Sequence, residues 1–567
     1  MRGQRGRRPV GRGRGRAAGG GRRGRRRTAV APSAARDRGR RRADPDEPGL
    51  PGRHPRRRTG PGVRGRGRRA VPGGQAVGDR VRSREAYLAA RVLDALVRED
   101  YGGLAARVDR TKAGAGLLLA DGRWVRLTRG SPFQDFVVAP DERLGLEQVL
   151  ETLVEVAHPA DSEGVAAFFD ECLTALAALE LHDAHREAVL RRGPSYESLA
   201  AFVDHPVHPT SRARVGATEA DLLAYAPEFA PTFALRWAVV PHAARSLPDD
   251  VARPECDGVL FPVHPMTVDE VRKIDGVRVL EEAAVAVRPT LSMRTVEVGP
   301  RTQLKLPLPV STLGVRNRRS IRAGTLEDGA KAELLLRRLA DPDVLLADEQ
   351  AFAHGGHEYL AWMVRRLPEG RIVPVAALAV PGVLDGLGPD VLPRYLRLLL
   401  RWNVRLFVRY GVALEAHQQN LALVLQGGRL RLLVKDNDGL LASPSRLAAA
   451  GIEAPGFADR RMLTDDPHAL ADVFVTITLH LAAAAVAFAV LPPARASALL
   501  RDTLAAALDE YGDDPMARLL RARTLDAARL TGKSMVTAGT LVAKERSGAR
   551  DVNKFYGISG PNYLRRA

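Results

Sequence analysis

Apolar residues recur at helical spacing near the start of the folded part of the chain and again toward its end. Leu88, Val92 and Leu96 share one face of Arg84–Asp100, and Gly102–Gly103 ends that predicted helix. The apolar pattern predicts further helices, which we place at 144–204, Asp328–Leu339, Val391–Tyr410 and 466–530. The apolar run Leu479–Pro492 is alanine-rich and predicts a buried core helix that is too short to span a membrane.

Short runs of β-formers between turn residues predict strands in three parts of the chain. These runs are Leu117–Ala120, Trp124–Leu127, Phe136–Ala139, Tyr359–Arg366, Ile372–Ala379, Leu421–Gln426 and Leu430–Lys435. Residues 205–325 read as a mixture of short strands and loops, and no internal repeat of 20–50 residues is present. Helices and antiparallel strands segregated along the chain predict an α+β fold.

The positive charge lies at the N-terminus. The chain has a formal net charge of +20, but residues 1–80 hold 26 Arg, no Lys and five acidic residues, so the remainder is close to neutral. Residues 1–82 contain almost no large apolar side chains, and we expect them to be disordered. Three interpretations stay open: a nucleic-acid-binding tail, a solvated extension, or a start site assigned too far upstream in a GC-rich gene.

Cysteine content, histidine spacing and the absence of long apolar segments argue against several classes of protein. Two cysteines, Cys172 and Cys256, give no disulfide framework, and the histidines show no HExxH or comparable zinc-site spacing. The N-terminus lacks the apolar segment of a secretory signal, and no transmembrane helix is predicted. We therefore expect a cytoplasmic protein with no membrane partner, for which nucleic acid is an unlikely ligand.

The first candidate cluster is the loop His205-Pro206-Val207-His208-Pro209, followed by Arg212 and Arg214. Proline stiffens the loop and favours extended geometry in the residue before it. The loop could present its imidazole and guanidinium groups to an anion. Alternatively, its histidines only cap neighbouring backbone groups.

The second cluster alternates hydroxyl and basic residues with apolar positions. It comprises Ser292, Arg294, Lys305 and the segment Thr312–Arg316, and we predict that Ser292, Arg294 and Lys305 share one face of adjacent strands. Such a face suits phosphate oxygens, because Arg binds them in a bidentate manner and Lys acts as a point charge. An ordinary solvated strand face is the alternative.

The third cluster flanks the predicted hairpin Leu421–Lys435. Asn420 precedes its first strand, and Asp436 and Asp438 follow its second. Antiparallel pairing would bring Asn420 and Asp436 together, where their oxygens could bind Mg²⁺ bridging nucleotide phosphates. Two polar turns without a ligand would give the same sequence pattern.

Taken together and in this order, the clusters resemble the IucA/IucC family, the aerobactin-synthetase-like enzymes of siderophore assembly independent of non-ribosomal peptide synthetases (NIS synthetases). The resemblance covers roughly residues 85–565. Its motifs appear as HPVHPTSR, SMRT, Lys305 with Arg316, EAHQQN and KDND, with FPVHP at 261–265 and Lys533-Ser534-Met535 as weaker matches. Arg212 stands where the family usually has Lys, and Lys435 stands where it usually has Arg.

The resemblance implies a hand-like architecture with finger, thumb and kinase-like palm regions, and we expect boundaries at 1–82, 83–204, 205–380 and 381–567. It implies a ligase that uses ATP and Mg²⁺ to adenylate a polycarboxylate, commonly citrate, and then joins it to an amine, hydroxylamine or alcohol. A homodimer is expected by resemblance only.

The resemblance also implies site roles. The expected ATP-binding residues are Ser292, Arg294, Thr295, Lys305, Arg316, His205, His208 and Arg212. The expected catalytic residues are His417, Arg316 and Lys305, the expected substrate-binding residues are Thr312, His417 and Gln419, and the expected metal ligands are Asn420, Asp436 and Asp438.

Two other functions remain open from the sequence. A kinase-like phosphotransferase is compatible with the hairpin Asn and Asp, although no glycine-rich phosphate loop precedes a strand. A nucleic-acid-binding protein acting through the Arg-rich tail would show strongly salt-dependent binding that requires residues 1–82.

Overall fold

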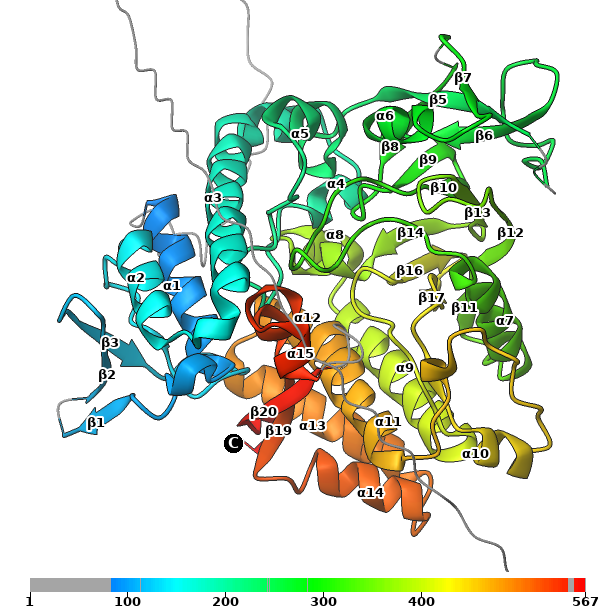
Figure 1. Cartoon of the computed structure of the whole chain (residues 1–567). Coiled ribbons are helices and arrows are strands. Elements are labelled where there is room, and N and C mark those ends of the chain that lie inside the picture. The colour runs from blue at the N-terminus through cyan, green and yellow to red at the C-terminus, as the bar shows by residue number, and fades with distance from the viewer. Residues whose placement is uncertain are drawn as a thin grey trace, which may run out of the picture. The chain divides into compact units, whose positions relative to one another are not determined.

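The predicted N-terminal helix forms over Arg84–Arg98 (α1) in a computed structural model that describes residues 83–565 apart from 113, 242, 244, 283 and 549–554 (Figure 1). Ser83 caps this helix, because its Oγ accepts a hydrogen bond from the Ala86 amide at 3.2 Å. The predicted Arg-rich tail, residues 1–82, lies outside the described residues.

An N-terminal helical layer packs beside a small antiparallel sheet. The helices are α2 (Leu146–Val156) and α3 (Ser162–Arg191), whereas the short helix α4 (Tyr196–Ala200) that follows them packs against the large C-terminal hydrophobic cluster. The sheet has the order β1 (Asp109–Thr111), β2 (Gly114–Leu118), β3 (Trp124–Thr128) and β4 (Val137–Val138). Their buried cluster also takes in Val536 and Leu541, so residues near the end of the chain complete the N-terminal core.

An eight-stranded sheet follows, and one of its inner strands ends in a basic residue. Its strand order is β12-β13-β10-β9-β8-β5-β6, with β7 paired to β5. The bounds are β5 (Phe233–Val240), β6 (Val259–Val263), β7 (Arg278–Val279), β8 (Ala284–Pro289), β9 (Thr295–Gly299), β10 (Thr302–Lys305), β12 (Asp348–His354) and β13 (Ala361–Arg366), with helices α5 (Glu219–Tyr225) and α6 (Val268–Arg272) at its margins. The central strand β10 thus places Lys305 at its end.

A second sheet carries the predicted hairpin. Its order is β11 (Val344–Leu346), β17 (Arg429–Val434), β16 (Leu421–Gln426) and β14 (Arg371–Pro374), and β11 runs parallel to β17. Helix α7 (Thr325–Arg338) lies against β11 and β12. The predicted strand Ile372–Ala379 is wrong in its second half, because residues 375–379 form a 3-10 turn.

The C-terminal part is mainly helical. Its elements are α8 (Val383–Leu387), α9 (Val391–Arg405) continued by a π-turn to Tyr410, α10 (Pro444–Ala449), α11 (Pro467–Val473), α12 (Ala485–Val490), α13 (Pro493–Asp509), α14 (Pro515–Arg523) and α15 (Lys544–Ser547). Two short ribbons accompany them, β15 (Val412–Ala413) with β18 (Leu441–Ala442) and β19 (Arg529–Lys533) with β20 (Tyr556–Pro561).

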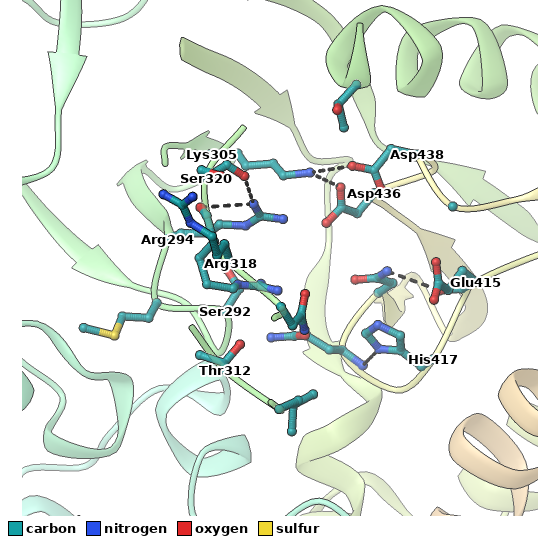
Figure 2. A pocket seen from close by; sticks show the side chains of 18 of the residues that line it. Ser292, Arg294, Lys305, Thr312, Arg318, Ser320, Glu415, His417, Asp436 and Asp438 are labelled. Atoms are coloured by element: carbon teal, nitrogen blue, oxygen red, sulfur yellow. Dashed lines mark hydrogen bonds and ion pairs between the residues drawn. The ribbon is translucent and has the colours of Figure 1, made fainter. Parts of the chain in front are cut away.

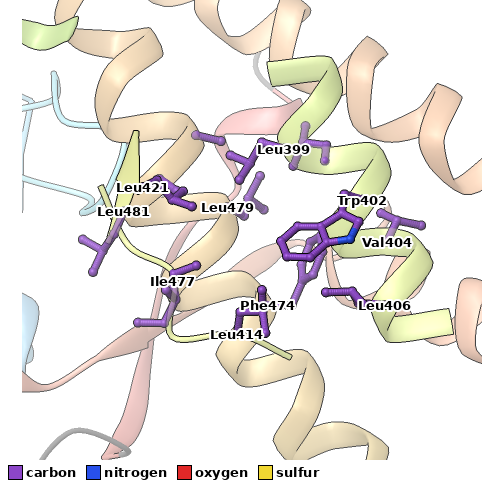
Figure 3. Packing of buried hydrophobic residues seen from close by; sticks show 14 of the residues in the cluster. Leu399, Trp402, Val404, Leu406, Leu414, Leu421, Phe474, Ile477, Leu479 and Leu481 are labelled. Atoms are coloured by element: carbon purple, nitrogen blue, oxygen red, sulfur yellow. The ribbon is translucent and has the colours of Figure 1, made fainter. Parts of the chain in front are cut away.

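The apolar run near residue 480 is longer than the sequence pattern indicated. A continuous helix covers Pro467–Val490, 24 residues, and is long and apolar enough to cross a membrane by length and composition. However, 72% of its most apolar window is buried. Phe474 and Ile477 share one cluster with Trp402 of α9 (Figure 3). Packing inside the protein therefore accounts for the apolar character of this helix, as predicted for a core helix.

Strands and helices segregate into these layers, so the fold is a mixed α/β fold. Chain segments far apart in sequence meet at its centre, because the end of β10 and the end of the β16–β17 hairpin carry side chains in direct contact.

Several histidines are buried in this fold in their neutral form. Burial lowers the pKa of His264 to about 3, and burial together with neighbouring cations lowers that of His182 to about 4 and that of His208 to about 3. Unfolded histidine titrates near pH 6.5, so the unfolded state binds more protons between pH 6.5 and the folded pKa. Folding stability due to these groups is therefore complete above about pH 6.5 and falls as the pH falls.

We expect this acid sensitivity to be measurable at His264. Lowering the pH from 7.5 to 5.0 should cost about 2 kcal/mol of unfolding free energy per such histidine. In His264→Asn the asparagine can still accept from the Met266 amide, as His264 Nδ1 does at 3.2 Å. Urea unfolding at both pH values should show a correspondingly smaller loss in this variant. An unchanged loss would contradict the buried, neutral state of His264.

Candidate active site

A cavity of about 1110 Å³ lies where the two sheets and the C-terminal segment meet. Figure 2 shows side chains from several of these elements pointing into one space. Twelve of the residues predicted from the sequence line it: His205, Arg212, Ser292, Arg294, Lys305, Thr312, Arg316, His417, Gln419, Asn420, Asp436 and Asp438. Residues between 205 and 438 of the chain thus form one site.

The cavity is strongly cationic. Eleven Arg and Lys residues line it against five Asp and Glu residues. The basic residues are Arg212, Arg214, Arg294, Lys305, Arg316, Arg318, Arg319, Arg322, Arg461, Lys533 and Lys544. Such an excess inside a concave surface attracts and concentrates polyanions.

A tight turn, rather than a strand, presents Ser292 and Arg294. The turn joins β8 to β9, and Met293 adopts a left-handed conformation at φ 62° while its side chain is buried in an apolar cluster. Ser292 Oγ accepts from the Thr295 amide at 3.1 Å, which closes the turn. The predicted common strand face is therefore wrong for these two residues, but the turn still directs them into the cavity with Lys305.

Buried contacts behind the turn connect it to the hairpin. Glu197 of α4 accepts from the Leu291 amide at 2.9 Å, and its other oxygen lies 3.4 Å from Lys435 Nζ. Lys435 is buried and does not line the cavity. The basic residue before Asp436 therefore has a supporting role in the described structure.

Lys305 joins the two sheets through an ion triad. Its ammonium forms ion pairs with Asp436 and, at 3.2 Å, with Asp438 Oδ2, and the side chain is only 2% exposed (Figure 2). Burial acts to raise the pKa of the Asp436 carboxyl, but Lys305 and Arg365 outweigh burial and hold it well below its usual range. Asp436 is therefore ionised at neutral pH.

The hairpin mouth forms as predicted. The Lys435 amide donates to the Asn420 carbonyl at 3.0 Å, which places Asn420 beside the strand that leads into Asp436. Asn420 Nδ2 donates to the Glu415 carbonyl at 3.3 Å. Gly439 lies close beside Glu415, and a Cβ at 439 would lie 2.0 Å from a carboxylate oxygen of Glu415 and force that side chain to shift.

The His417 imidazole is neutral at physiological pH. Burial, and then repulsion from Lys533, lower its pKa to about 4. Its Nδ1 accepts from the Gln419 amide at 3.3 Å, which leaves Nε2 as the protonated nitrogen of the neutral ring. His417 can therefore donate a hydrogen bond to an anionic ligand without adding charge.

A clamp made by the C-terminal segment holds Arg316. Its Nη1 donates to the carbonyls of Ala538 at 3.0 Å and Val542 at 2.7 Å. Glu171 of α3 supports the same contact, because it accepts from the Thr540 hydroxyl at 2.7 Å. Arg316 lines the cavity, but these bonds give it a structural task that the sequence did not indicate.

The His-Pro loop has mainly a backbone-capping role, which was the alternative left open by the sequence. His205 Nδ1 accepts from the His208 amide at 2.9 Å, and Arg212 is paired with Asp204 at 2.6 Å. His208 is completely buried, and Thr295 is 3% exposed. Neither residue lines the cavity, which corrects the prediction that they contact ATP.

Arg319 also lines the cavity, although it was not among the residues predicted from the sequence. Its Nε is buried, with no hydrogen-bond partner among the described residues, and burial together with repulsion from Arg294 lowers its pKa to about 9. Arg319 therefore remains charged at neutral pH. The signal was present in the sequence, since Arg316–Arg322 holds four arginines in seven residues.

The predicted Mg²⁺ ligands fit a cation that is shared with phosphate. The carboxylates of Asp436 and Asp438 converge on one point, because both contact Lys305 Nζ. No cluster of three or more His, Cys, Asp or Glu that could hold a metal occurs in the described part of the chain. Mg²⁺ in nucleotide sites is commonly held by one or two carboxylates, with phosphates and water completing the shell.

Comparison with known proteins supports the family resemblance. Residues 195–380 match the model of the IucA / IucC family. This segment of the chain is therefore similar to the IucA/IucC family. Residues 391–544 match a second model, described as ferric iron reductase FhuF-like transporter, and the chain's two cysteines both lie outside that segment. The ion triad joins the two matched segments, since Lys305 lies in the first and its partners in the second.

Three curated relatives share part of their sequence with this chain. It is 26% identical to the rhizobactin siderophore biosynthesis protein RhbC of Rhizobium meliloti (45% of this chain, 55% of the relative). It is 24% identical to staphyloferrin B synthase of Staphylococcus aureus (69% and 80%). It is 26% identical to L-2,3-diaminopropanoate–citrate ligase of Staphylococcus aureus (43% and 53%). The chain thus spans about half the length of two of these relatives.

Solved structures share the fold of this chain. The petrobactin biosynthesis protein AsbB of Bacillus anthracis aligns with a TM-score of 0.67 at 18% identity, over 85% of this chain and 96% of that chain. ATP-bound aerobactin synthetase IucA of Klebsiella pneumoniae aligns with a TM-score of 0.59 at 18% identity, over 84% and 99%.

Proposed function

We propose that this protein is an ATP-dependent ligase of siderophore biosynthesis, which adenylates a polycarboxylate and joins it to an amine, hydroxylamine or alcohol. The observation that carries the proposal is the cationic cavity, in which basic side chains outnumber carboxylates by eleven to five. A triphosphate and a polycarboxylate are both polyanions, and holding them together requires such an excess of positive charge. The names of the relatives, which include a citrate ligase and a siderophore synthase, support this choice of reaction.

In the first step, a carboxylate oxygen of the acid attacks the α-phosphorus of ATP. An acyl–oxygen–phosphorus bond forms, the bond to the β-phosphate bridging oxygen breaks, and pyrophosphate leaves. Attack of one anion on another requires cations aimed at the developing charge, which Arg294 and Arg319 can supply because both line the cavity. Ser292 would donate to a phosphate oxygen, and Arg316 and Thr312 would seat the acid.

In the second step, the nucleophile attacks the acyl carbon, AMP leaves with the bonding electron pair, and the nucleophile loses a proton. Neutral His417 would donate a hydrogen bond to the adenylate, and Gln419 would form hydrogen bonds with hydroxyl or carboxylate oxygens of the acid. Asn420, Asp436 and Asp438 would hold Mg²⁺, which supplies charge neutralisation for the phosphates. Lys305 would orient both carboxylates and add positive charge beside them.

The wider assignments are part of the same proposal. The two sheets and the N-terminal helices would correspond to the fingers, palm and thumb of a hand-like enzyme with boundaries at 204 and 380. The protein would act in the cytoplasm, where ATP is available. A homodimer remains a prediction from the family.

We expect pyrophosphate and AMP, rather than ADP, when the protein is incubated with ATP, Mg²⁺ and a polycarboxylic acid such as citrate. A screen of acids for pyrophosphate release, followed by a screen of amines against the best acid, would identify the substrates. Removing residues 1–82 should leave the activity unchanged, because the side chains that we propose to bind the substrates all lie between residues 205 and 438. Formation of ADP would favour the kinase-like alternative, and loss of all activity on truncation would favour the tail-based one.

A further inference from the structure

The Asp436 backbone adopts a conformation that side-chain-bearing residues rarely adopt. Its φ is 63°, and it is one of six non-glycine residues with positive φ in the described part of the chain. The left-handed region costs such a residue about 1 kcal/mol or more, although Asp tolerates it better than most residues. Strain of this kind persists where surrounding contacts fix it, and it is frequent at functional sites.

Glu349 supplies the contact that fixes this residue. The Asp436 amide donates to both oxygens of the Glu349 carboxylate, at 2.9 and 3.2 Å. Glu349 belongs to β12, is 4% exposed and does not line the cavity. The Glu349 amide donates to the Glu333 carboxylate of α7 at 2.8 Å, which anchors the Glu349 main chain to that helix.

The same carboxylate also positions Arg365 of β13. Arg365 Nε donates to Glu349 Oε1 at 2.5 Å, whereas Arg365 Nη2 lies 3.9 Å from Asp436 Oδ1, beyond hydrogen-bond distance. Charges therefore alternate from Lys305 through Asp436 and Arg365 to Glu349. By engaging Arg365 through Nε, Glu349 leaves the Asp436 oxygens directed toward Lys305 and the cavity.

We propose that Glu349 is a positioning residue for the nucleotide-bound divalent cation. It acts through Asp436: its bifurcated hydrogen bond holds the Asp436 main chain in the left-handed conformation, and that conformation directs the carboxylate to the point it shares with Asp438. Glu349 itself touches neither substrate nor metal. This inference rests on the proposed function, because it assumes a metal–ATP complex in the cavity.

The variants separate the hydrogen bond from the charge. Glu349→Gln keeps an oxygen that can accept from the Asp436 amide, whereas Glu349→Ala removes the acceptor. Glu369→Gln is the matched control, since Glu369 follows β13 on the same sheet and pairs with Arg301 at the exposed surface. If Glu349→Ala fails to fold, Glu349→Leu combined with Arg365→Met replaces the buried ion pair by apolar side chains and also lacks the acceptor.

The probe is Mn²⁺, titrated by electron paramagnetic resonance in the presence of an α,β-methylene analogue of ATP. We expect Glu349→Ala, or the double variant, to bind Mn²⁺ at least tenfold more weakly than the unmodified protein. Glu349→Gln should stay within about threefold of it and the control should be unchanged. Analogue affinity without metal should change less than twofold in every variant.

Two outcomes would overturn the inference in different ways. Unmodified Mn²⁺ affinity in folded Glu349→Ala, even with a lowered melting temperature, would show that Glu349 only stabilises the fold. Absence of nucleotide-dependent Mn²⁺ binding in the unmodified protein would overturn the inference together with the metal–ATP part of the proposed function. The first outcome leaves the proposed function intact, so the two failures are distinguishable.

Discussion

Replacing Asp436 with alanine is expected to lower acid-dependent pyrophosphate release at least about 100-fold, because removing one preorganised electrostatic group from a reacting site costs a factor of about 10²–10³. The variant loses the carboxylate that pairs with Lys305 and that we propose as a metal ligand. Lys305 keeps Asp438 as a partner, so the protein should still fold. The measurement is pyrophosphate release with saturating ATP, Mg²⁺ and the best acid.

Asp343→Ala is a suitable control for this experiment. Asp343 lies beside the opposite end of the hairpin, where it pairs with Arg429 at the surface, and it does not line the cavity. The Asp343→Ala variant should release pyrophosphate at the same rate as the unmodified protein. A rate near normal in folded Asp436→Ala would remove the metal-binding hairpin from the mechanism.

The second large effect is expected at Glu99, which caps the C-terminal segment. This carboxylate is 6% exposed and accepts from three consecutive amides, those of Met535, Val536 and Thr537, at 3.0, 3.2 and 2.8 Å. Hydrogen bonds to a charged group each contribute about 1.5–3 kcal/mol, and loss of the acceptor leaves the buried donors unpaired. Glu99→Ala should therefore lower the unfolding free energy by about 3–5 kcal/mol.

Hydrogen exchange can localise this effect. Amides of residues 534–542 should exchange faster in Glu99→Ala, and Glu99→Gln should recover part of the protection because it keeps an acceptor oxygen. Glu163→Ala is the control, since Glu163 is exposed in the first turn of α3. Equal exchange of the segment in Glu99→Ala and in the unmodified protein would contradict the capping role.

Local features of the site could be predicted from the sequence. The hairpin mouth formed where the turn Gly427-Gly428 and the flanking apolar runs placed it, and Asn420 pairs with the residue before Asp436. The turn that carries Ser292 and Arg294 was expected as a strand. Its geometry depends on the left-handed Met293, and a methionine gives no local signal for that conformation.

Partners distant in sequence could not be predicted. Glu99 and Glu171 hold residues 535–540, more than 360 positions away, and nothing in the local pattern pairs a particular carboxylate with a particular amide. The role of Glu349 could not be predicted for the same reason. In the sequence it is one acidic residue on a strand, and only the structure shows its contact with Asp436. The length of the apolar helix Pro467–Val490 was underestimated because only its alanine-rich second half was considered.

The ion triad also constrains how such a gene can vary. Lys305 and its two aspartates are encoded on either side of the junction between the segments that match two different family models. Recombination at that junction would combine Lys305 from one parent protein with Asp436 and Asp438 from another, and the positions of these three side chains would no longer be matched. We therefore expect functional chimaeras to be those in which β10 and the β16–β17 hairpin come from the same parent protein.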